Sequence, residues 1–208
     1  DDDLFDRGFR LLRKTLFTTH PYQFDALGSK ETVSRFTRQE CLAFAKRWLV
    51  PNNTVLAAFG DVQETAILPE LQRRFGASAR AESLWPDQLT ADPLEEIRQA
   101  SLTLPKEQSL VLLGFRGTRL RDPDRDTLDV LAMVLSGMSG RLFQAVREQQ
   151  GLSYTLGASS VPGWDPGFFV VYAATRPEER QRVMATLLEQ LEAFAKTGPT
   201  EEEVDLAK

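Results

Sequence analysis

Residues 139–160, SGRLFQAVREQQGLSYTLGASS, contain a helix-patterned run, a glycine turn and the start of a strand. The helical run carries Arg147 and ends at Gly151, and the strand-like run that follows carries Tyr154. Two interpretations fit this pattern. Either Arg147 is a solvated helix end and Tyr154 a half-buried strand residue, or the two side chains form a pair directed at one ligand. Both interpretations predict a helix–turn–strand unit.

The alternation of strands and helices extends over the second half of the chain. Apolar residues recur at helical spacing in the predicted helices, and Leu142 and Phe143 are expected to be core residues. Thr200 and Glu203 predict a capping box at the start of a further helix. The predicted strands cover residues 97–105, 108–117, 153–160 and 167–175, and the predicted helices cover 127–138, 140–151 and 177–196.

The first half of the chain has a similar organisation. Apolar spacing predicts a helix over residues 4–17, and Thr37 with Glu40 predicts a capping box at the start of a second helix. Residues 54–60, TVLAAFG, predict a strand, and a turn and a helix are expected over residues 61–76. One apolar strand, one turn and one amphipathic helix therefore follow each other here as they do in the second half.

Strands mixed with helices that each have one apolar face place the chain in the α+β class, with sheets covered by helices on one face. Residues 86–96 interrupt this pattern, because they belong to a polar stretch with two prolines and no periodicity. Such a composition is typical of a linker. The sequence therefore predicts two lobes joined at about residues 86–96.

The composition is that of an ordinary globular protein. Hydrophobic residues make up 42% of the 208 residues and charged residues 26%, so intrinsic disorder is not expected. The net charge of −5, with both signs interleaved, gives no basic footprint for nucleic acid. The nearly apolar runs are too short to span a bilayer, which predicts a soluble protein. A single cysteine does not distinguish the cytoplasm from the periplasm, so the compartment stays open.

The chain has one histidine and one cysteine, which limits the metal chemistry that it can perform. A structural zinc site of Cys and His needs four ligands, and most catalytic zinc sites need three protein ligands that include His. His20 and Cys41 cannot supply either set. The phosphate-binding loop, the dinucleotide fingerprint and the nucleophile elbow are also absent from the sequence. Taken alone, the chain is expected to hold no metal and to be catalytically inactive.

Three stretches of the sequence occur in a characteristic order and spacing. They are HPY followed by LGSKETVSRFTRQECLAFAKRWLVPNNTVLAAFGDV, the run from LGFRGTRLRDP to REQQGLSYT, and the closing PTEEEVDLAK. In order and spacing they resemble the insulinase, pitrilysin and mitochondrial-processing-peptidase family, whose signature is the inverted zinc motif H-x-x-E-H. The resemblance implies a zinc peptidase of two halves that close around a peptide, each half with two α+β domains. Residues 1–85 would be the later part of one domain and residues 97–208 most of the next.

In that family one half carries the zinc motif and the other an arginine and a tyrosine seven residues apart, which Arg147 and Tyr154 match. The resemblance therefore implies that Arg147 orients a peptide substrate and that Tyr154 stabilises the tetrahedral intermediate. His20 matches the family's HPY turn and not a zinc ligand. Zinc is expected in the complete enzyme, on an upstream segment or on a sister half or subunit, and the abrupt start and mid-helix end favour a chain cut from a longer polypeptide. The alternative is a catalytically inactive structural or substrate-binding partner of the same fold.

Overall fold

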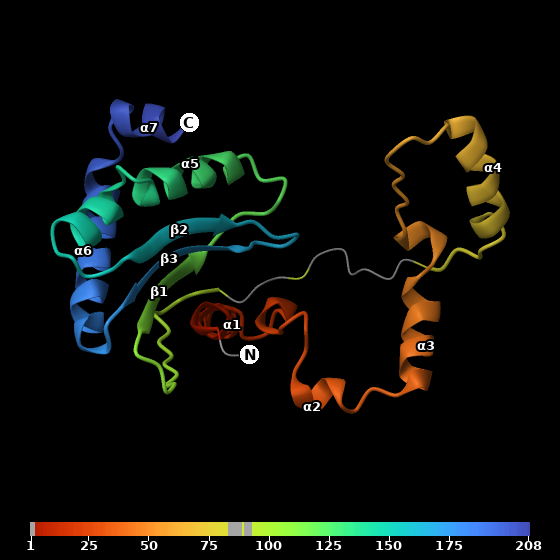
Figure 1. The fold of residues 1–208 in the computed structure, drawn as a ribbon, viewed down its shortest axis with the longest axis horizontal. Coiled ribbons are helices and arrows are strands. Elements are labelled where there is room, and N and C mark those ends of the chain that lie inside the picture. The colour runs from red at the N-terminus through yellow and green to blue at the C-terminus, as the bar shows by residue number, and fades with distance from the viewer. Residues whose placement is uncertain (1–2, 83–88, 90–92) are drawn as a thin grey trace. The chain divides into compact units, whose positions relative to one another are not determined.

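The computed structural model describes residues 3–82, 89 and 93–208 (Figure 1). The chain divides into two compact units, of which one contains residues 1–25 and 89–208 and the other residues 26–88. The predicted domains, with residues 1–85 as the later part of one and residues 97–208 as most of the next, stay a prediction. Within the predicted linker at 86–96, residues 86–88 and 90–92 lie outside the described residues.

The first unit is built on an antiparallel sheet of β1 (Ser109–Arg116), β2 (Thr155–Val161) and β3 (Phe168–Thr175), in the order β1-β3-β2. In the register, Leu113 of β1 lies opposite Val171 of β3, and Ala158 of β2 lies opposite the same residue. The central strand β3 is almost continuously apolar and almost fully buried. A strand of this kind needs cover on both of its faces.

Both faces of β3 are covered by helices (Figure 1). On one face, α5 (Arg125–Ser136), the helical segment before Gly151 and α6 (Arg180–Thr197) enclose the larger core. On the other face, α1 (Leu4–Leu16) covers a smaller core. The larger core contains Ala132, Leu135, Leu142, Val146, Leu152, Phe169, Val171, Ala173, Val183 and Leu187; the smaller contains Leu12, Leu16, Phe17, Phe168 and Val170.

This architecture confirms the α+β class. The structure adds α1 on the second face of the sheet, a helix that the sequence analysis assigned to the preceding lobe. The remaining helical elements of this unit are the short turns η1 (Pro21–Gln23) and η4 (Pro177–Glu179), the π-helix η3 (Phe143–Glu148) and α7 (Glu201–Ala207). Throughout the part of the chain that the structure describes, every helix is too short or too polar to cross a bilayer.

Two capping boxes predicted from the sequence are confirmed. At the start of α3 (Arg38–Trp48), the Thr37 N–H donates to Glu40 Oε2 at 2.8 Å and the Glu40 N–H donates to Thr37 Oγ1 at 3.2 Å. At the start of α7, Thr200 and Glu203 make the same reciprocal pair at 2.7 and 3.2 Å. These bonds satisfy backbone donors that the first turn of a helix otherwise leaves without partners.

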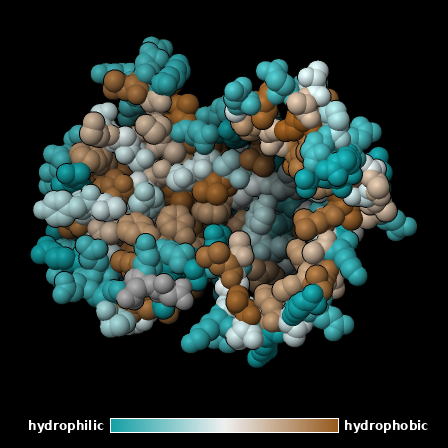
Figure 2. Space-filling model, turned by 45° about the vertical axis from the view of Figure 1, so that its right-hand side comes forward, coloured by the Kyte–Doolittle hydropathy of each residue, from teal (hydrophilic) through white to brown (hydrophobic). Residues whose placement is uncertain are grey.

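The second unit contains α2 (Lys30–Val33), α3, η2 (Pro51–Asn53) and α4 (Glu64–Phe75). Among its described residues only Val50 is a buried apolar residue, and large apolar side chains lie open to solvent along all of its helices. Figure 2 shows such apolar residues, in brown, on the surface of the molecule. In the described part of this unit, the helices therefore share no apolar core beyond Val50.

The strand predicted over residues 54–60 is wrong for this structure, which has irregular backbone there. Val55 and Phe59 alternate as in a strand, yet they are 94% and 93% exposed. The physical reason is that a strand forms by hydrogen bonding to a neighbouring strand, and the described residues of this unit hold none.

The strand predicted over residues 97–105 is also wrong, since the structured part of the sheet begins at β1. The apolar residues Ile97 and Leu102 of this stretch are 90% and 54% exposed. Alternation predicts a strand only when one face is buried against something, and these residues have no such face.

Candidate functional site

The helical segment from Arg141 to Glu148 is the first element of the site. Its main part is the π-helix η3, in which the Gln149 N–H donates to the carbonyl of Gln144, five residues earlier, at 2.9 Å. Leu142 and Val146 are fully buried and attach this segment to the larger core. π-turns inside helices are rare and occur frequently at functional sites, because the wider turn changes the direction of the side chains that follow.

The turn after this segment is the second element. Gly151 has φ of +63°, a left-handed conformation that glycine adopts without strain. Beyond it, the hydroxyl of Ser153 donates to the carbonyl of Ala174 at 2.6 Å, and the hydroxyl of Thr175 donates to the carbonyl of Leu152 at 2.6 Å. Two buried hydrogen bonds therefore attach the turn to β3 and set the position at which Tyr154 leaves it.

The structure brings Arg147 and Tyr154 together. The Cζ atom of Arg147 lies 5.9 Å from the centroid of the Tyr154 ring and 4.7 Å from that of Phe143, so that the guanidinium contacts two aromatic rings. Tyr154 is 86% exposed, and the side chain of Arg147 is 41% exposed, with its Nε 3.9 Å from Glu148 Oε1. Both polar groups are thus open to solvent and to a ligand.

Phe143 departs from its prediction as a core residue. Leu142 is fully buried as expected, whereas Phe143 is only partly buried and lies under the Arg147 guanidinium. A cation over an aromatic face is attracted by about 0.5–1 kcal/mol at an exposed site. The spacing of four residues between Phe143 and Arg147 is the sequence signal that could have indicated this contact.

His20 has a structural role in the HPY turn. It is 3% exposed, its Nε2 lies 3.1 Å from Oδ2 of Asp165, and its Nδ1 accepts a hydrogen bond from the Tyr22 N–H at 3.2 Å. The Tyr22 hydroxyl in turn accepts a hydrogen bond from the backbone N–H of Asp165 at 3.1 Å. Both ring nitrogens of the chain's one histidine are therefore engaged within the protein.

These contacts do not fit a zinc site. In the described ranges 3–82, 89 and 93–208, no group of three or more His, Cys, Asp and Glu side chains is placed to hold a metal ion. Cys41 is exposed on α3 and is not in a disulfide.

Comparison with known proteins shows the family of this chain. The family description "Peptidase M16 inactive domain" matches residues 35–208, most of the chain and the whole of the Arg147–Tyr154 region. The chain belongs to the M16 peptidase family. The family resemblance noted in the sequence is thereby confirmed.

Relatives of this M16 chain carry names that agree with the family. An uncharacterized zinc protease of Mycobacterium tuberculosis is 33% identical over 211 residues, which cover 100% of this chain and 48% of the relative. A zinc protease of Bacillus subtilis, also uncharacterized, is 27% identical over 202 residues and covers 95% of the chain and 48% of the relative. The chain thus spans about half the length of the curated relatives that it matches.

Solved structures resemble the M16 chain over nearly its full length. A peptidase M16 inactive domain from Pseudomonas fluorescens superposes with a TM-score of 0.85 at 25% identity, over 99% of this chain and 50% of that one. A protease from Helicobacter pylori has a TM-score of 0.82 at 18% identity, over 93% of this chain and 48% of that one. The second likeness concerns the fold alone.

Proposed function

We propose that this chain is the part of a zinc-dependent metallopeptidase that binds the peptide and stabilises the transition state, while another part supplies the zinc. The observation that carries the proposal is the pairing of Arg147 with Tyr154. Both side chains are exposed to solvent, and Arg147 Cζ lies 5.9 Å from the centroid of the Tyr154 ring. Buried hydrogen bonds attach the turn between them to β3. Relatives of the chain are named zinc proteases, which supports peptide hydrolysis as the reaction.

Tyr154 is assigned the role of an oxyanion donor. Its side chain is open to solvent, so its O–H can reach a carbonyl oxygen that a partner presents. In peptide hydrolysis negative charge develops on that oxygen, and a bound zinc ion polarises the carbonyl and activates the attacking water. A neutral donor aimed at such an oxygen typically contributes about 3–4 kcal/mol to catalysis.

Arg147 is assigned the role of gripping the substrate backbone. Its guanidinium presents several N–H donors in a planar fork, which suits a carbonyl of an extended peptide. Phe143 and Tyr154 contact the guanidinium by their rings and leave its edges free to donate. The arginine is therefore held in direction without losing its donors to a strong ion pair.

A zinc-bearing segment, sister half or subunit of the same family is the proposed partner. Two facts support it: the relatives are about twice as long as this chain, and the unit of residues 26–88 exposes apolar side chains that a partner could cover. A substantial exposed apolar surface marks an interaction site more often than a free surface.

A second candidate function is a catalytically inactive structural or substrate-binding partner of the same fold. The matched family description, which calls this domain inactive, favours it. The two candidates differ in what they require of Arg147 and Tyr154, because a purely structural partner needs neither.

The test uses the complete zinc-bearing protein and a quenched peptide substrate. We expect Arg147→Ala to lower kcat/KM at least tenfold, chiefly by raising KM, with zinc content unchanged. Arg125→Ala, at an equally exposed arginine in the first turn of α5, is the matched control and leaves both constants unchanged. An Arg147→Ala protein with unchanged kcat/KM would contradict the peptidase role and favour the structural one.

A further inference from the structure

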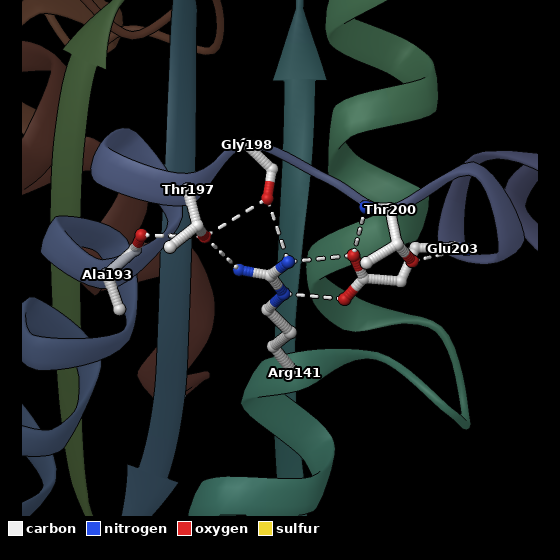
Figure 3. Close-up of polar contacts among 6 residues, drawn as sticks. All are labelled: Arg141, Ala193, Thr197, Gly198, Thr200 and Glu203. Carbon is white, nitrogen blue, oxygen red and sulfur yellow. Dashed lines mark hydrogen bonds and ion pairs between the residues drawn. The ribbon is translucent and has the colours of Figure 1, made fainter.

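Arg141, at the other end of the helical segment that carries Arg147, holds a network of polar contacts to α6 and α7 (Figure 3). Its Nε and Nη2 donate to Glu203 Oε1 and Oε2 at 2.5 and 2.7 Å, and Nη2 also donates to the carbonyl of Gly198 at 2.8 Å. Nη1 donates to Thr197 Oγ1 at 3.3 Å. We call this set of contacts the Arg141 clamp.

The acceptors of the Arg141 clamp are themselves fixed. Glu203 belongs to the capping box of α7, where its Oε2 also accepts from the Thr200 N–H. Gly198 ends α6 with φ of +67°, which directs its carbonyl towards Arg141. The guanidinium also lies 5.0 Å over the ring of Phe194 of α6. The hydrogen bonds from Arg141, together with those from Thr200, lower the pKa of Glu203 to about 2.

The Arg141 clamp is unusual for a surface ion pair. Its two side chains are only 21% and 25% exposed, and the paired hydrogen bonds match the fork of arginine to both carboxylate oxygens. Bidentate pairs of this kind add geometric specificity to their attraction. By contrast, the ion pair of Arg147 is long, with 3.9 Å between its Nε and Glu148 Oε1, so its direction depends on the rings of Phe143 and Tyr154 and on the backbone that carries it.

That backbone is fixed at both ends. The turn at Gly151, with the hydrogen bonds of Ser153, fixes the end after Arg147, and the Arg141 clamp fixes the end before it. Between them lies the π-helix η3, whose wide turn is a less regular geometry than an α-helix. The contacts of Leu142 and Val146 with the larger core hold the segment against the sheet. An additional polar anchor at its start restrains its rotation.

We propose that Arg141 is a positioning residue for Arg147, acting through the start of the helical segment and the C-terminal helix α7. The inference rests on the proposed function, in which Arg147 grips the peptide. Without the clamp, the start of the segment is held by the buried Leu142 and no longer by the polar contacts to α6 and α7, so its rotation is less restrained and the Arg147 guanidinium samples more directions. Because misplacement by about 1 Å can cost as much as 10²-fold, loss of the clamp weakens substrate binding without removing any group that touches substrate.

The test compares two clamp variants with a matched control in the complete zinc-bearing protein. Glu203→Gln removes the charge and keeps the capping box, because glutamine also serves at this position. Arg141→Lys keeps the charge and removes the fork. Glu202→Gln, one residue earlier on α7 and exposed, is the control. Circular dichroism of each variant shows whether it is folded, and Glu203→Gln is mild enough to keep the test informative if Arg141→Lys unfolds.

We expect both clamp variants to raise KM about 5- to 20-fold with kcat changed less than about twofold, and Glu202→Gln to leave both constants unchanged. In the Arg147→Ala background the same clamp variants should change KM less than about twofold, because the residue they position is gone.

Full additivity of the clamp and Arg147 variants would overturn the positioning role and reduce the clamp to a structural contact. Unchanged KM in the clamp variants, with a reduced kcat/KM in Arg147→Ala, would also overturn it and leave the proposed function standing. If Arg147→Ala itself has unchanged kcat/KM, the proposed function fails and this inference fails with it.

Discussion

Replacement of Glu203 by glutamine should destabilise the chain in a manner that depends on pH. Glu203 is the partner of Arg141, and their two hydrogen bonds of 2.5 and 2.7 Å join the start of α7 to the segment that carries Arg147. Glu203→Gln removes one charge of this pair and leaves the side-chain length and the capping role in place. The variant therefore removes the charge and one of the two acceptor oxygens that face Arg141, while the remaining oxygen can still accept from the Thr200 N–H.

The pKa of Glu203 sets the upper limit of the effect. A carboxyl whose pKa falls from 4.5 in the unfolded chain to about 2 in the folded chain stabilises the fold by at most about 3.4 kcal/mol. A quarter of the side chain is exposed, so solvent and salt screen part of this stabilisation. We therefore expect Glu203→Gln to lower the free energy of unfolding by about 1–2 kcal/mol at pH 7, or roughly 2–8 °C in Tm for a chain of this length.

The pH dependence has a defined sign. Because the folded pKa lies below the unfolded pKa, the stabilisation is complete above about pH 5 and is lost as the pH falls from about 4.5 towards 2. The difference in free energy of unfolding between the wild type and Glu203→Gln should thus shrink steadily over this interval. Urea unfolding followed by circular dichroism at pH 7, 5, 4 and 3 measures it.

Glu202→Gln is the control, since it changes a neighbouring exposed carboxyl in the same turn of α7. It should alter the free energy of unfolding at pH 7 by less than about 0.5 kcal/mol. A Glu203→Gln loss that equals the control at pH 7, or that does not change between pH 5 and pH 3, would refute the strength assigned to the Arg141 clamp.

Three further substitutions test the supports of the site. Val146→Ala should lower the free energy of unfolding by about 1–3 kcal/mol, because shortening this fully buried side chain leaves a cavity in the core; an unchanged urea midpoint would contradict the packing of η3. Gly151→Ala should cost about 1 kcal/mol by thermal unfolding, since alanine is strained at φ of +63°, and no loss of Tm would mean that the turn has another conformation. Phe143→Leu should raise KM for a peptide about 2- to 5-fold by removing a cation–π contact of about 0.5–1 kcal/mol, and an unchanged KM would mean that the ring does not orient Arg147.

Elements with local signals were predictable from the sequence. The capping box of Thr200 and Glu203 lies within four residues, and the apolar stripe of α6 repeats over 18 residues, so both elements could be predicted without knowledge of the fold. The approach of Arg147 to Tyr154 was also predictable in outline, because a glycine turn between a helix and a strand brings the two ends to one edge.

Elements that depend on distant partners were not predictable. The strand expected at residues 54–60 has the right alternation but needs a neighbouring strand, and alternation does not reveal whether one exists. The partners Arg141 and Glu203 lie 62 residues apart, and a pair of opposite charges at that separation carries no sequence signal. The π-helix was likewise missed, because an apolar pattern cannot distinguish its turn from an α-helical one.

The most direct test of the central claim, that this chain supplies transition-state stabilisation to a zinc site located elsewhere, is kcat for Tyr154→Phe in the complete zinc-bearing protein. Tyr172→Phe, which removes a hydroxyl from a tyrosine of β3 whose ring packs against Phe5 of α1, is the matched control. With zinc content equal in all three proteins, the account predicts that kcat falls roughly 10²- to 10³-fold in Tyr154→Phe and changes less than about threefold in Tyr172→Phe. A Tyr154→Phe protein with the kcat of the wild type would contradict it.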